Sequence, residues 1–328
     1  MPNISYGDAL AEFIFALQVV LTRRYLKYND SFLFFQTLRI FEYHSGMQGL
    51  IHLISRLPLK YLQMLGAFLG LIMYWFSAKD KKLIRENLAQ AQQKYPFTAN
   101  PISIAKSAGQ MLTDSLWIWQ HPNEALQKTD LIHWDVVESA ISEGKGLLML
   151  TPHLGAFEMI PRVLAEYFPA TIIYKPAKQA WLEKIITKGR EHPHMNFVPA
   201  NMQGVRQIAR ALAKGEAVGI LPDQVPGNGE GVWAPFFGRH AYTAVLPAKI
   251  AQKNNIPTIV FTAIRKPQGK GWTIDAQRIN EPFDQNPEQA ATQLNTFLEK
   301  VIVKNPEQYL WMYNRYKHPT GAPLPPTQ

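Results

Sequence analysis

The sequence predicts an α/β protein in which a mostly parallel central sheet is flanked by helices and preceded by a helical, membrane-associated segment. Two observations support this fold class. From residue 145, short apolar runs alternate with segments of helical periodicity, which is typical of parallel strands joined by helices. Before residue 145, helical patterns dominate, and residues 61–76 form an almost uncharged run, YLQMLGAFLGLIMYWF.

Length and charge limit the possible classes of protein. The chain has 328 residues, and 34 Lys and Arg against 25 Asp and Glu give it a net charge of +9. This length is enough for one large domain, with or without an appendage. The positive charge favours an anionic partner such as nucleic acid, acidic phospholipid, a phosphorylated substrate or an acidic carrier protein. Cysteine is absent from the sequence, which excludes disulfides, thiolate nucleophiles and thiolate metal ligands.

The chain before the α/β domain is predicted to be helical. Residues 1–46 are apolar and rich in aromatic residues, and we interpret them as a helical extension to which the sequence assigns no role. Residues 47–100 are predicted to form a membrane-associated helical segment that contains the apolar run.

The apolar run at 61–76 is the basis for predicting membrane attachment. As a helix, its 16 residues would cover about 24 Å, which is less than the roughly 30 Å of a hydrocarbon core. Tyr74 and Trp75 near its end, followed by lysines at positions 79, 81 and 82, are typical of a membrane interface with a basic flank. Spanning and in-plane placement both stay open, and the alternative is a buried core helix.

Residues 101–318 are predicted to form the α/β domain, and residues 319–328 a Pro-rich, disordered tail. The first part of the domain, residues 101–144, has mostly helical patterns. Strands are expected at the apolar runs 146–150, 170–174, 196–200, 217–222 and 257–264. Helices are expected at 180–190, 203–214 and 243–254.

The segment GLLMLTPHLGAFEMIP, residues 146–161, runs from a predicted strand into His153 and then Glu158, an HX4E spacing. On one regular helix, positions five apart point about 140° away from each other. The two side chains therefore meet only if His153 lies in the turn after the strand and Glu158 in the first helical turn. Gly155 supplies the backbone freedom for such a turn. The carboxyl end of a strand is also where open α/β sheets place their sites.

A His–Glu pair in that position suits proton abstraction. Neutral imidazole accepts a proton from a hydroxyl near neutral pH, and a carboxylate on its other nitrogen holds the ring and stabilises the imidazolium. The sequence has no cysteine and no G-x-S-x-G motif for a nucleophilic serine, so the pair suits direct attack by a substrate hydroxyl on an activated ester such as a thioester. Taken alone, a buried histidine with an ordinary helix-start acid is the alternative.

Asp223 and Gln224 follow the predicted strand at 217–222, again at a carboxyl end. We interpret them as candidates for substrate binding, with a plain strand-to-loop turn as the alternative. The Gly-rich stretch VPGNGEGVWAPFFG after them is a candidate for a mobile loop over the substrate. His192 and His194 have an H-x-H spacing, which permits a metal-dependent hydrolase as a rival, but no third ligand follows at ordered spacing, and we expect no metal.

Four separated blocks carry a resemblance to a known family. They are IRENLAQAQQKYP, HLGAFE, KGEAVGILPDQVPGNGEGVWAPFFGRHAYTAVLPAKIA and NPEQYLWMYNRYKHP, in this order within residues 47–318. Together they resemble the lipid A late acyltransferases, the lauroyl and myristoyl acyltransferases of lipopolysaccharide and lipooligosaccharide biosynthesis in Gram-negative bacteria. The chain departs from the pattern at Pro152, where many relatives have Asn, at Ala156, where a polar residue is common, and at YNRYK, where relatives often have HRRFK.

The resemblance implies a glycerophosphate-acyltransferase-like fold on the cytoplasmic face of the inner membrane. It implies transfer of a fatty acyl chain from acyl carrier protein to a hydroxyl of a Kdo-bearing lipid A precursor, with no covalent intermediate and no separate cofactor. His153 takes the position of the general base and Glu158 that of its carboxylate partner. Arg190 matches a Gly-Arg position, where a guanidinium suits a phosphate of the lipid or of the carrier's phosphopantetheine.

The partners expected from this resemblance are acyl carrier protein, the lipid A precursor and membrane lipids. Aromatic and cationic residues alternate in YLWMYNRYK near the carboxyl terminus, and a membrane-interface belt fits this pattern better than nucleic acid. Two alternatives remain open at this point. One is an acyltransferase of the same fold that acts on lysophosphatidate, a glycolipid or an ornithine lipid, and the other is a catalytically silent membrane scaffold.

Overall fold

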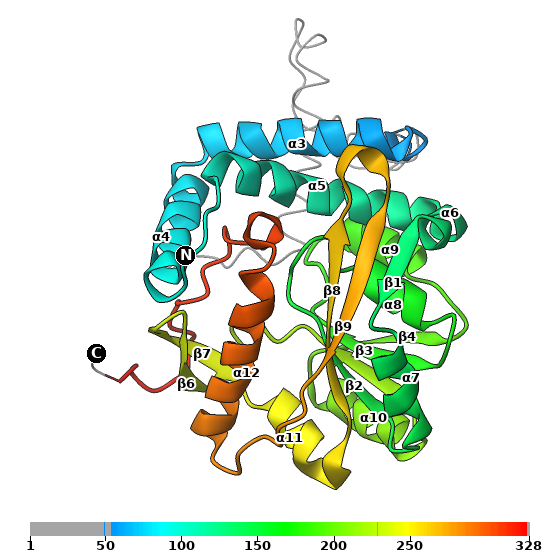
Figure 1. Ribbon diagram of the computed structural model, residues 1–328, viewed down its shortest axis with the longest axis vertical. Coiled ribbons are helices and arrows are strands. Elements are labelled where there is room, and N and C mark those ends of the chain that lie inside the picture. Colours follow the sequence, from blue (N-terminus) through cyan, green and yellow to red (C-terminus); the bar gives the residue numbers. More distant parts are fainter. Residues whose placement is uncertain (1–48, 50–53, 228, 327–328) are drawn as a thin grey trace, which may run out of the picture.

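The computed structural model describes residues 49, 54–227 and 229–326, so the predicted extension at 1–46 lies outside the described residues. The described chain forms a seven-stranded sheet with helices on both faces, and Figure 1 shows a pair of helices across one end. This confirms the predicted α/β class, whereas its glycerophosphate-acyltransferase-like character stays a prediction.

The sheet is mostly parallel. Its strands are β1 (Thr129–Ile132), β2 (Leu147–Leu150), β3 (Ala170–Tyr174), β4 (Met195–Pro199), β5 (Ala217–Ile220), β8 (Thr258–Arg265) and β9 (Trp272–Arg278). Their order is β1-β9-β8-β2-β5-β3-β4, and the only antiparallel pair within this described sheet is β8 with β9. All five expected strands are present, within two residues at each end.

Both faces of the sheet are buried, as its continuous apolar strands require. In β2, Leu147 and Met149 belong to one core cluster, whereas Leu148 and Leu150 belong to the other. The first cluster includes side chains of α3 (Leu59–Phe76), α5 (Pro101–Gln120), α8 (Met159–Leu164) and α9 (Ala180–Gly189). The second includes side chains of α4 (Ala78–Lys94), α10 (Met202–Ala213), α11 (Leu246–Gln252) and α12 (Pro287–Ile302). Short helices α6 (Pro122–Gln127) and α7 (Asp135–Ser142) flank β1 in the chain.

A β-hairpin replaces part of the expected loop. Strands β6 (Gly231–Phe236) and β7 (Arg239–Ala244) pair antiparallel around Phe237 and Gly238, which both have positive φ angles, 48° and 79°. Two such residues are what a two-residue hairpin turn of type I′ requires. The stretch predicted as a mobile loop is therefore a strand in its second half, and α11 begins at Leu246, three residues later than the expected helix.

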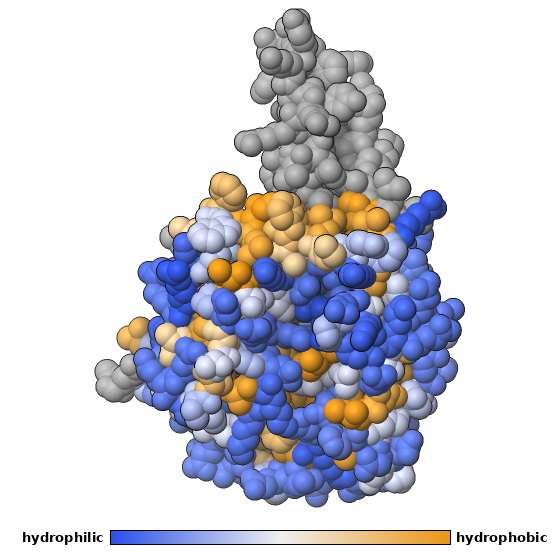
Figure 2. Space-filling view, turned by 45° about the horizontal axis from the view of Figure 1, so that its top comes forward, coloured by the Kyte–Doolittle hydropathy of each residue, from blue (hydrophilic) through white to orange (hydrophobic). Residues whose placement is uncertain are grey.

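Helix α3, which contains the apolar run, packs against α5 through glycines. A Cβ atom on Gly109 of α5 would lie only 2.0 Å from the carbonyl oxygen of Gly66, and one on Gly70 would lie 2.1 Å from that of Ala105. These close approaches explain why one face of the helix is buried. The opposite face carries Tyr61, Met64, Phe68 and Trp75, each more than half exposed, and Figure 2 shows an apolar band on this end of the molecule.

Among the described residues, α3 is the one helix that is long and apolar enough to cross a membrane, judged by length and composition alone. Residues 319–326 form no helix or strand, and the indole Nε1 of Trp233 donates a hydrogen bond to the carbonyl oxygen of Pro323.

Candidate active site

Strand pairing brings His153 and Asp223 together. Strands β2 and β5 are parallel neighbours in which Leu150 lies opposite Ile220, and each of the two site residues comes three positions later. The ring Nδ1 of His153 donates to Oδ1 of Asp223 at 2.8 Å, and the backbone N–H of His153 donates to Oδ2, also at 2.8 Å. One buried carboxylate therefore holds both the ring and the backbone of the histidine.

Glu158 has different partners, so the predicted His153–Glu158 pair is corrected. Its Oε2 accepts hydrogen bonds from the indole of Trp119 at 3.1 Å and from Nε of Arg190 at 3.0 Å. Its Oε1 accepts a further bond from the Arg190 guanidinium. Glu158 lies at the N-cap of α8, one residue before the predicted first helical turn, and its carboxylate binds a cation in place of the imidazole.

The backbone between the two residues explains this outcome. Leu154 and Gly155 form isolated β-bridges to Tyr309 and Ala263, and the N–H of Ala156 donates to the carbonyl oxygen of Ala263. Residues 154–156 are therefore held against β8 and the carboxyl-terminal segment. They do not form the single tight bend that a His153–Glu158 contact would need. Gly155 has the positive φ angle, 62°, that the prediction gave to this position.

The electrostatics of the pair set the tautomer of His153. Burial alone would raise the pKa of Asp223, but the neighbouring His153 and the hydrogen bonds that it donates hold this pKa below its ordinary value. An ionised carboxylate only accepts hydrogen bonds, so Nδ1 carries the proton and Nε2 of the neutral ring keeps its lone pair. Nε2 is therefore the basic atom of this site.

Gln224 covers that basic atom. Its Nε2 lies 3.2 Å from Nε2 of His153, and because the ring nitrogen is an acceptor, the amide N–H donates to it. His153 is only 5% exposed, whereas Gln224 is partly exposed and leads into the loop residues 225–227. The amide therefore occupies the hydrogen-bonding position at Nε2. The structure thus brings His153, Asp223 and Gln224 into one cluster and puts Glu158 and Arg190 into another.

A buried arginine, Arg315, also acts on Asp223, and the sequence analysis missed it. Arg315 donates to the carbonyl oxygen of Tyr242 at 2.7 Å and to Oγ1 of Thr243 at 2.8 Å, and burial lowers its pKa. It belongs to the charges that lower the pKa of Asp223. Burial and, after it, the Asp223 carboxylate raise the pKa of Tyr309 well above its ordinary value. The sequence pattern at this position is a single arginine within the aromatic YNRYK segment, and such a pattern does not indicate that the arginine is buried.

Arg190 is also positioned by aromatic rings. Its guanidinium lies 5.3 Å from the ring centre of Tyr174 and 4.7 Å from that of Phe197, within the range of a cation–π contact. Together with Glu158, these rings fix the guanidinium against the protein. The structure therefore gives Arg190 a protein carboxylate as a partner, and the phosphate contact that the resemblance implied stays a prediction.

His192 and His194 belong to neither of these two clusters. Nε2 of His192 lies 3.4 Å from Oε1 of Glu166, and Nδ1 of His194 hydrogen-bonds to the carbonyl oxygen of Ala165 at 2.8 Å. Within residues 54–227 and 229–326, no group of three or more His, Asp or Glu side chains is arranged to hold a metal ion.

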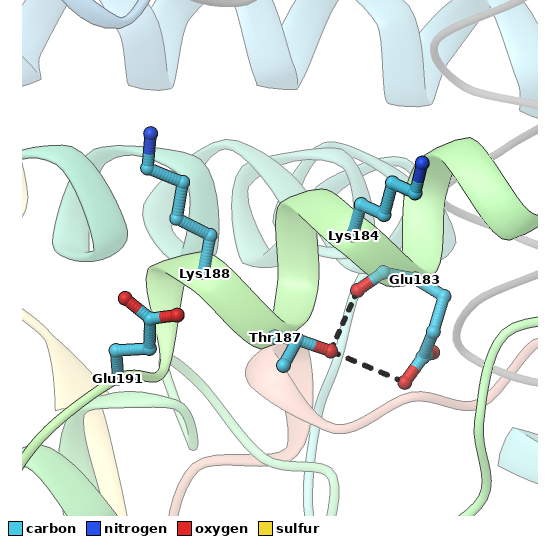
Figure 3. Close-up of a pocket in the computed structure, with 5 residues that line it drawn as sticks. All are labelled: Glu183, Lys184, Thr187, Lys188 and Glu191. Atoms are coloured by element: carbon cyan, nitrogen blue, oxygen red, sulfur yellow. Dashed lines mark hydrogen bonds between the residues drawn. The ribbon is translucent and has the colours of Figure 1, made fainter.

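An open surface depression lies along α9, close to Arg190 in the chain (Figure 3). It is lined by Glu183, Lys184, Thr187, Lys188 and Glu191. The Thr187 hydroxyl donates to the carbonyl oxygen of Glu183, which satisfies it within the helix. The depression contains no member of either cluster described above, so we assign it no part in the site.

Comparison with known proteins gives consistent matches. The pattern of the family described as bacterial lipid A biosynthesis acyltransferase matches residues 34–318. The chain is 27% identical to a lipid A biosynthesis palmitoleoyltransferase of Escherichia coli, over 83% of this chain and 90% of that protein. It is 25% identical to a lipid A biosynthesis lauroyltransferase of the same organism, over 84% and 92%. A lipid A biosynthesis acyltransferase of Haemophilus influenzae is 22% identical, over 80% and 86%.

Proposed function

Because the chain belongs to the bacterial lipid A biosynthesis acyltransferase family, we propose that it transfers a fatty acyl chain from acyl carrier protein to a hydroxyl of a Kdo-bearing lipid A precursor. The carrier thioester is both donor and activated ester, so the reaction uses no separate cofactor. The observation that supports this chemistry is the buried pair of His153 and Asp223, in which the basic Nε2 faces away from the carboxylate.

The proposed reaction is a direct transfer. Nε2 of His153 takes the proton of the acceptor hydroxyl as its oxygen attacks the thioester carbonyl carbon. Asp223 stabilises the imidazolium, as a buried carboxylate does in other hydroxyl-activating sites. When the tetrahedral intermediate collapses, the carbon–sulfur bond breaks and the imidazolium returns its proton to the thiolate. An ester, a free carrier thiol and neutral His153 result, with no covalent enzyme intermediate.

Gln224 has two consecutive tasks in this reaction. In the structure its amide satisfies the lone pair of His153 Nε2. The acceptor hydroxyl displaces this amide, and the freed N–H donor then lies within reach of the negative oxygen that develops on the carbonyl. The N–H groups of Gly155 and Ala156 do not serve this purpose, because they donate to Gln308 and Ala263.

Glu158 and Arg190 act as a positioning pair. The carboxylate lies at the start of α8, and the guanidinium reaches it from the carboxyl end of α9. The pair joins two crossover helices beside the loop that carries His153. Removal of one member breaks a buried ion pair, which is costly in a protein interior.

Membrane attachment is proposed to run through α3 in the plane of the bilayer. One face of this helix packs on α5 through Gly66 and Gly70, so lipid cannot surround it as it surrounds a spanning helix. The carboxyl end of β8, which is parallel to β2, reaches α3 (Figure 1). The carboxyl ends of the parallel strands, after which His153 and Asp223 lie, therefore point toward the same end of the molecule as the exposed apolar face of α3. The cytoplasmic face of the inner membrane is the side that acyl carrier protein can reach.

Replacing Met64 and Phe68 with Ser tests this placement. Each side chain is more than half exposed on the outer face of α3. Loss of about 1.5–3 kcal/mol of burial per side chain lowers the fraction bound to vesicles more than tenfold. Unchanged flotation with vesicles would refute the in-plane placement.

The function itself is tested in cells and in vitro. Lipid A from cells that lack the gene is expected to lose acyl chains, and the wild-type gene restores them whereas His153→Asn does not. Purified protein is expected to acylate the precursor from acyl carrier protein, and not lysophosphatidate or ornithine lipid. An unchanged lipid A mass spectrum, or full activity of His153→Asn, would defeat the proposal.

A further inference from the structure

Two lysines that form no ion pair with the described residues lie near the carboxyl ends of the parallel strands, the end of the sheet at which His153 and Asp223 meet. In the sheet, β3 lies next to β5 and parallel to it. Lys175 directly follows β3, and Asp223 and Gln224 follow β5, so all three residues lie beyond the carboxyl ends of two neighbouring strands. Lys175 is exposed. No carboxylate of residues 54–227 and 229–326 forms a salt bridge with it or with Lys317.

Lys317, in the carboxyl-terminal segment, lies near the same end of the sheet. Its Nζ lies 4.8 Å from the ring centre of Tyr313. The hydroxyl of Tyr313 in turn accepts a hydrogen bond from the backbone N–H of Val225 at 2.9 Å, and Val225 directly follows Gln224. One aromatic ring therefore connects the lysine to the chain that carries the catalytic residues. Lys317 is partly buried, which strengthens its electrostatic interactions.

The surroundings of Lys317 are cationic. Burial, then Lys175 and then Arg315 lower the pKa of Lys317 to about 8. No carboxylate is among the groups that act on the pKa of Lys317. Positive charges held together in this way are unfavourable, and an anion between them offsets the repulsion.

We propose that Lys175 and Lys317 form a phosphate subsite next to the catalytic histidine. This inference rests on the proposed function and assigns a phosphate contact to the two lysines. The ligand is a phosphate group of one of the two substrates, either on the lipid acceptor or in the phosphopantetheine arm of the carrier. Ammonium groups bind phosphate as point charges, and Tyr313 supports Lys317 from one side.

Steady-state kinetics with the full chain distinguish the two sources. Lys175→Ala and Lys317→Ala are each expected to raise one KM about tenfold, the effect of one charged hydrogen bond, with kcat nearly unchanged. A raised KM for the lipid identifies the acceptor phosphate, and removal of that phosphate then cancels the difference from wild type. A raised KM for the carrier identifies the phosphopantetheine. Lys214→Ala, at an exposed site after α10, is the matched control and changes neither KM.

A pH series gives a second measurement. As the pH rises through about 8, Lys317 loses its proton, and the affected KM of the wild type is expected to rise. Lys317→Arg keeps the charge and removes this dependence. Tyr313, whose pKa burial raises to about 12, stays neutral over this range. The other groups that act on Lys317, Lys175 and Arg315, are cations.

Binding of inorganic phosphate tests the subsite without any reaction. It is expected to raise the thermal midpoint of wild type and of His153→Asn, and to have no effect on the double variant Lys175→Ala/Lys317→Ala. Equal shifts in all three proteins, or unchanged KM values in the single variants, would overturn the subsite. Absence of acyl transfer by wild type, with the phosphate shift intact, would instead defeat only the proposed function.

Discussion

Asp223→Asn is the change that best separates the observed pair from the one the sequence indicated. Asp223 accepts two hydrogen bonds from His153, one from Nδ1 and one from the backbone N–H. Asparagine has one acceptor oxygen, so one of these donors faces an NH₂ group. If that donor is Nδ1, the ring adopts the other tautomer, its proton moves to Nε2, and the basic atom is lost.

The expected cost follows from the charge that is removed. Imidazolium and carboxylate groups joined by a hydrogen bond of 2.8 Å have charge centres about 4 Å apart, and at an effective dielectric constant of 20 their attraction is about 4 kcal/mol. Each 1.36 kcal/mol of transition-state stabilisation changes the rate tenfold, so kcat is expected to fall about a thousandfold.

The assay is single-turnover acyl transfer from radiolabelled carrier thioester, normalised to the amount of folded protein. Glu158→Gln is the matched control, because it also changes one buried carboxylate to an amide, but in the cluster with Arg190. It is expected to cost less in kcat than Asp223→Asn. The double variant His153→Asn/Asp223→Asn is expected to be no slower than His153→Asn alone, because the two residues act as a unit.

Three results would refute this reasoning. One is a larger loss of kcat for Glu158→Gln than for Asp223→Asn when both proteins are folded. The second is additive losses for His153 and Asp223, which would mean that the carboxylate acts independently of the ring. The third is a kcat for Asp223→Asn within a few-fold of wild type.

Further predictions concern packing, the cover of the base and the second cluster. Gly109→Ala is expected to lower the free energy of unfolding by about 3 kcal/mol, because its Cβ would lie 2.0 Å from a carbonyl oxygen of α3. Gly227→Ala, at an open position, changes it by less than about 0.5 kcal/mol; equal effects in denaturant titrations would contradict the close packing. Gln224→Glu places a carboxylate beside the basic nitrogen, favours the protonated ring and removes activity at neutral pH, with recovery at higher pH in the pH–rate profile. A profile identical to wild type would show that Gln224 does not face the base. Arg190→Gln and Glu158→Gln each remove one side of a buried ion pair and cost about 3–5 kcal/mol of stability, whereas the double variant costs less than their sum. Additive values in this double-mutant cycle would contradict the ion pair.

Secondary structure followed local patterns wherever the pattern was strong. The strand at 170–174 and the helix at 180–190 agree with β3 and α9 within one residue, because apolar runs of strand length and helical spacing are properties of short segments. Strands β1, β6, β7 and β9 were missed. Their residues mix polar, aromatic and small side chains, and the positive φ angle at Phe237 that makes the β6–β7 turn has no strong sequence signal.

Local sequence patterns were thus sufficient for the fold class, for the loop position of His153 and for a helix that starts directly after Glu158. The partner of His153 was not accessible in this way, since Asp223 lies 70 residues further along the chain. It was decided by the parallel pairing of β2 with β5, which sets Leu150 opposite Ile220 and brings two carboxyl-terminal strand ends together. Spacing along a chain limits which neighbours can meet, but distant side chains come into contact through strand order and register, and those depend on how the whole sheet packs.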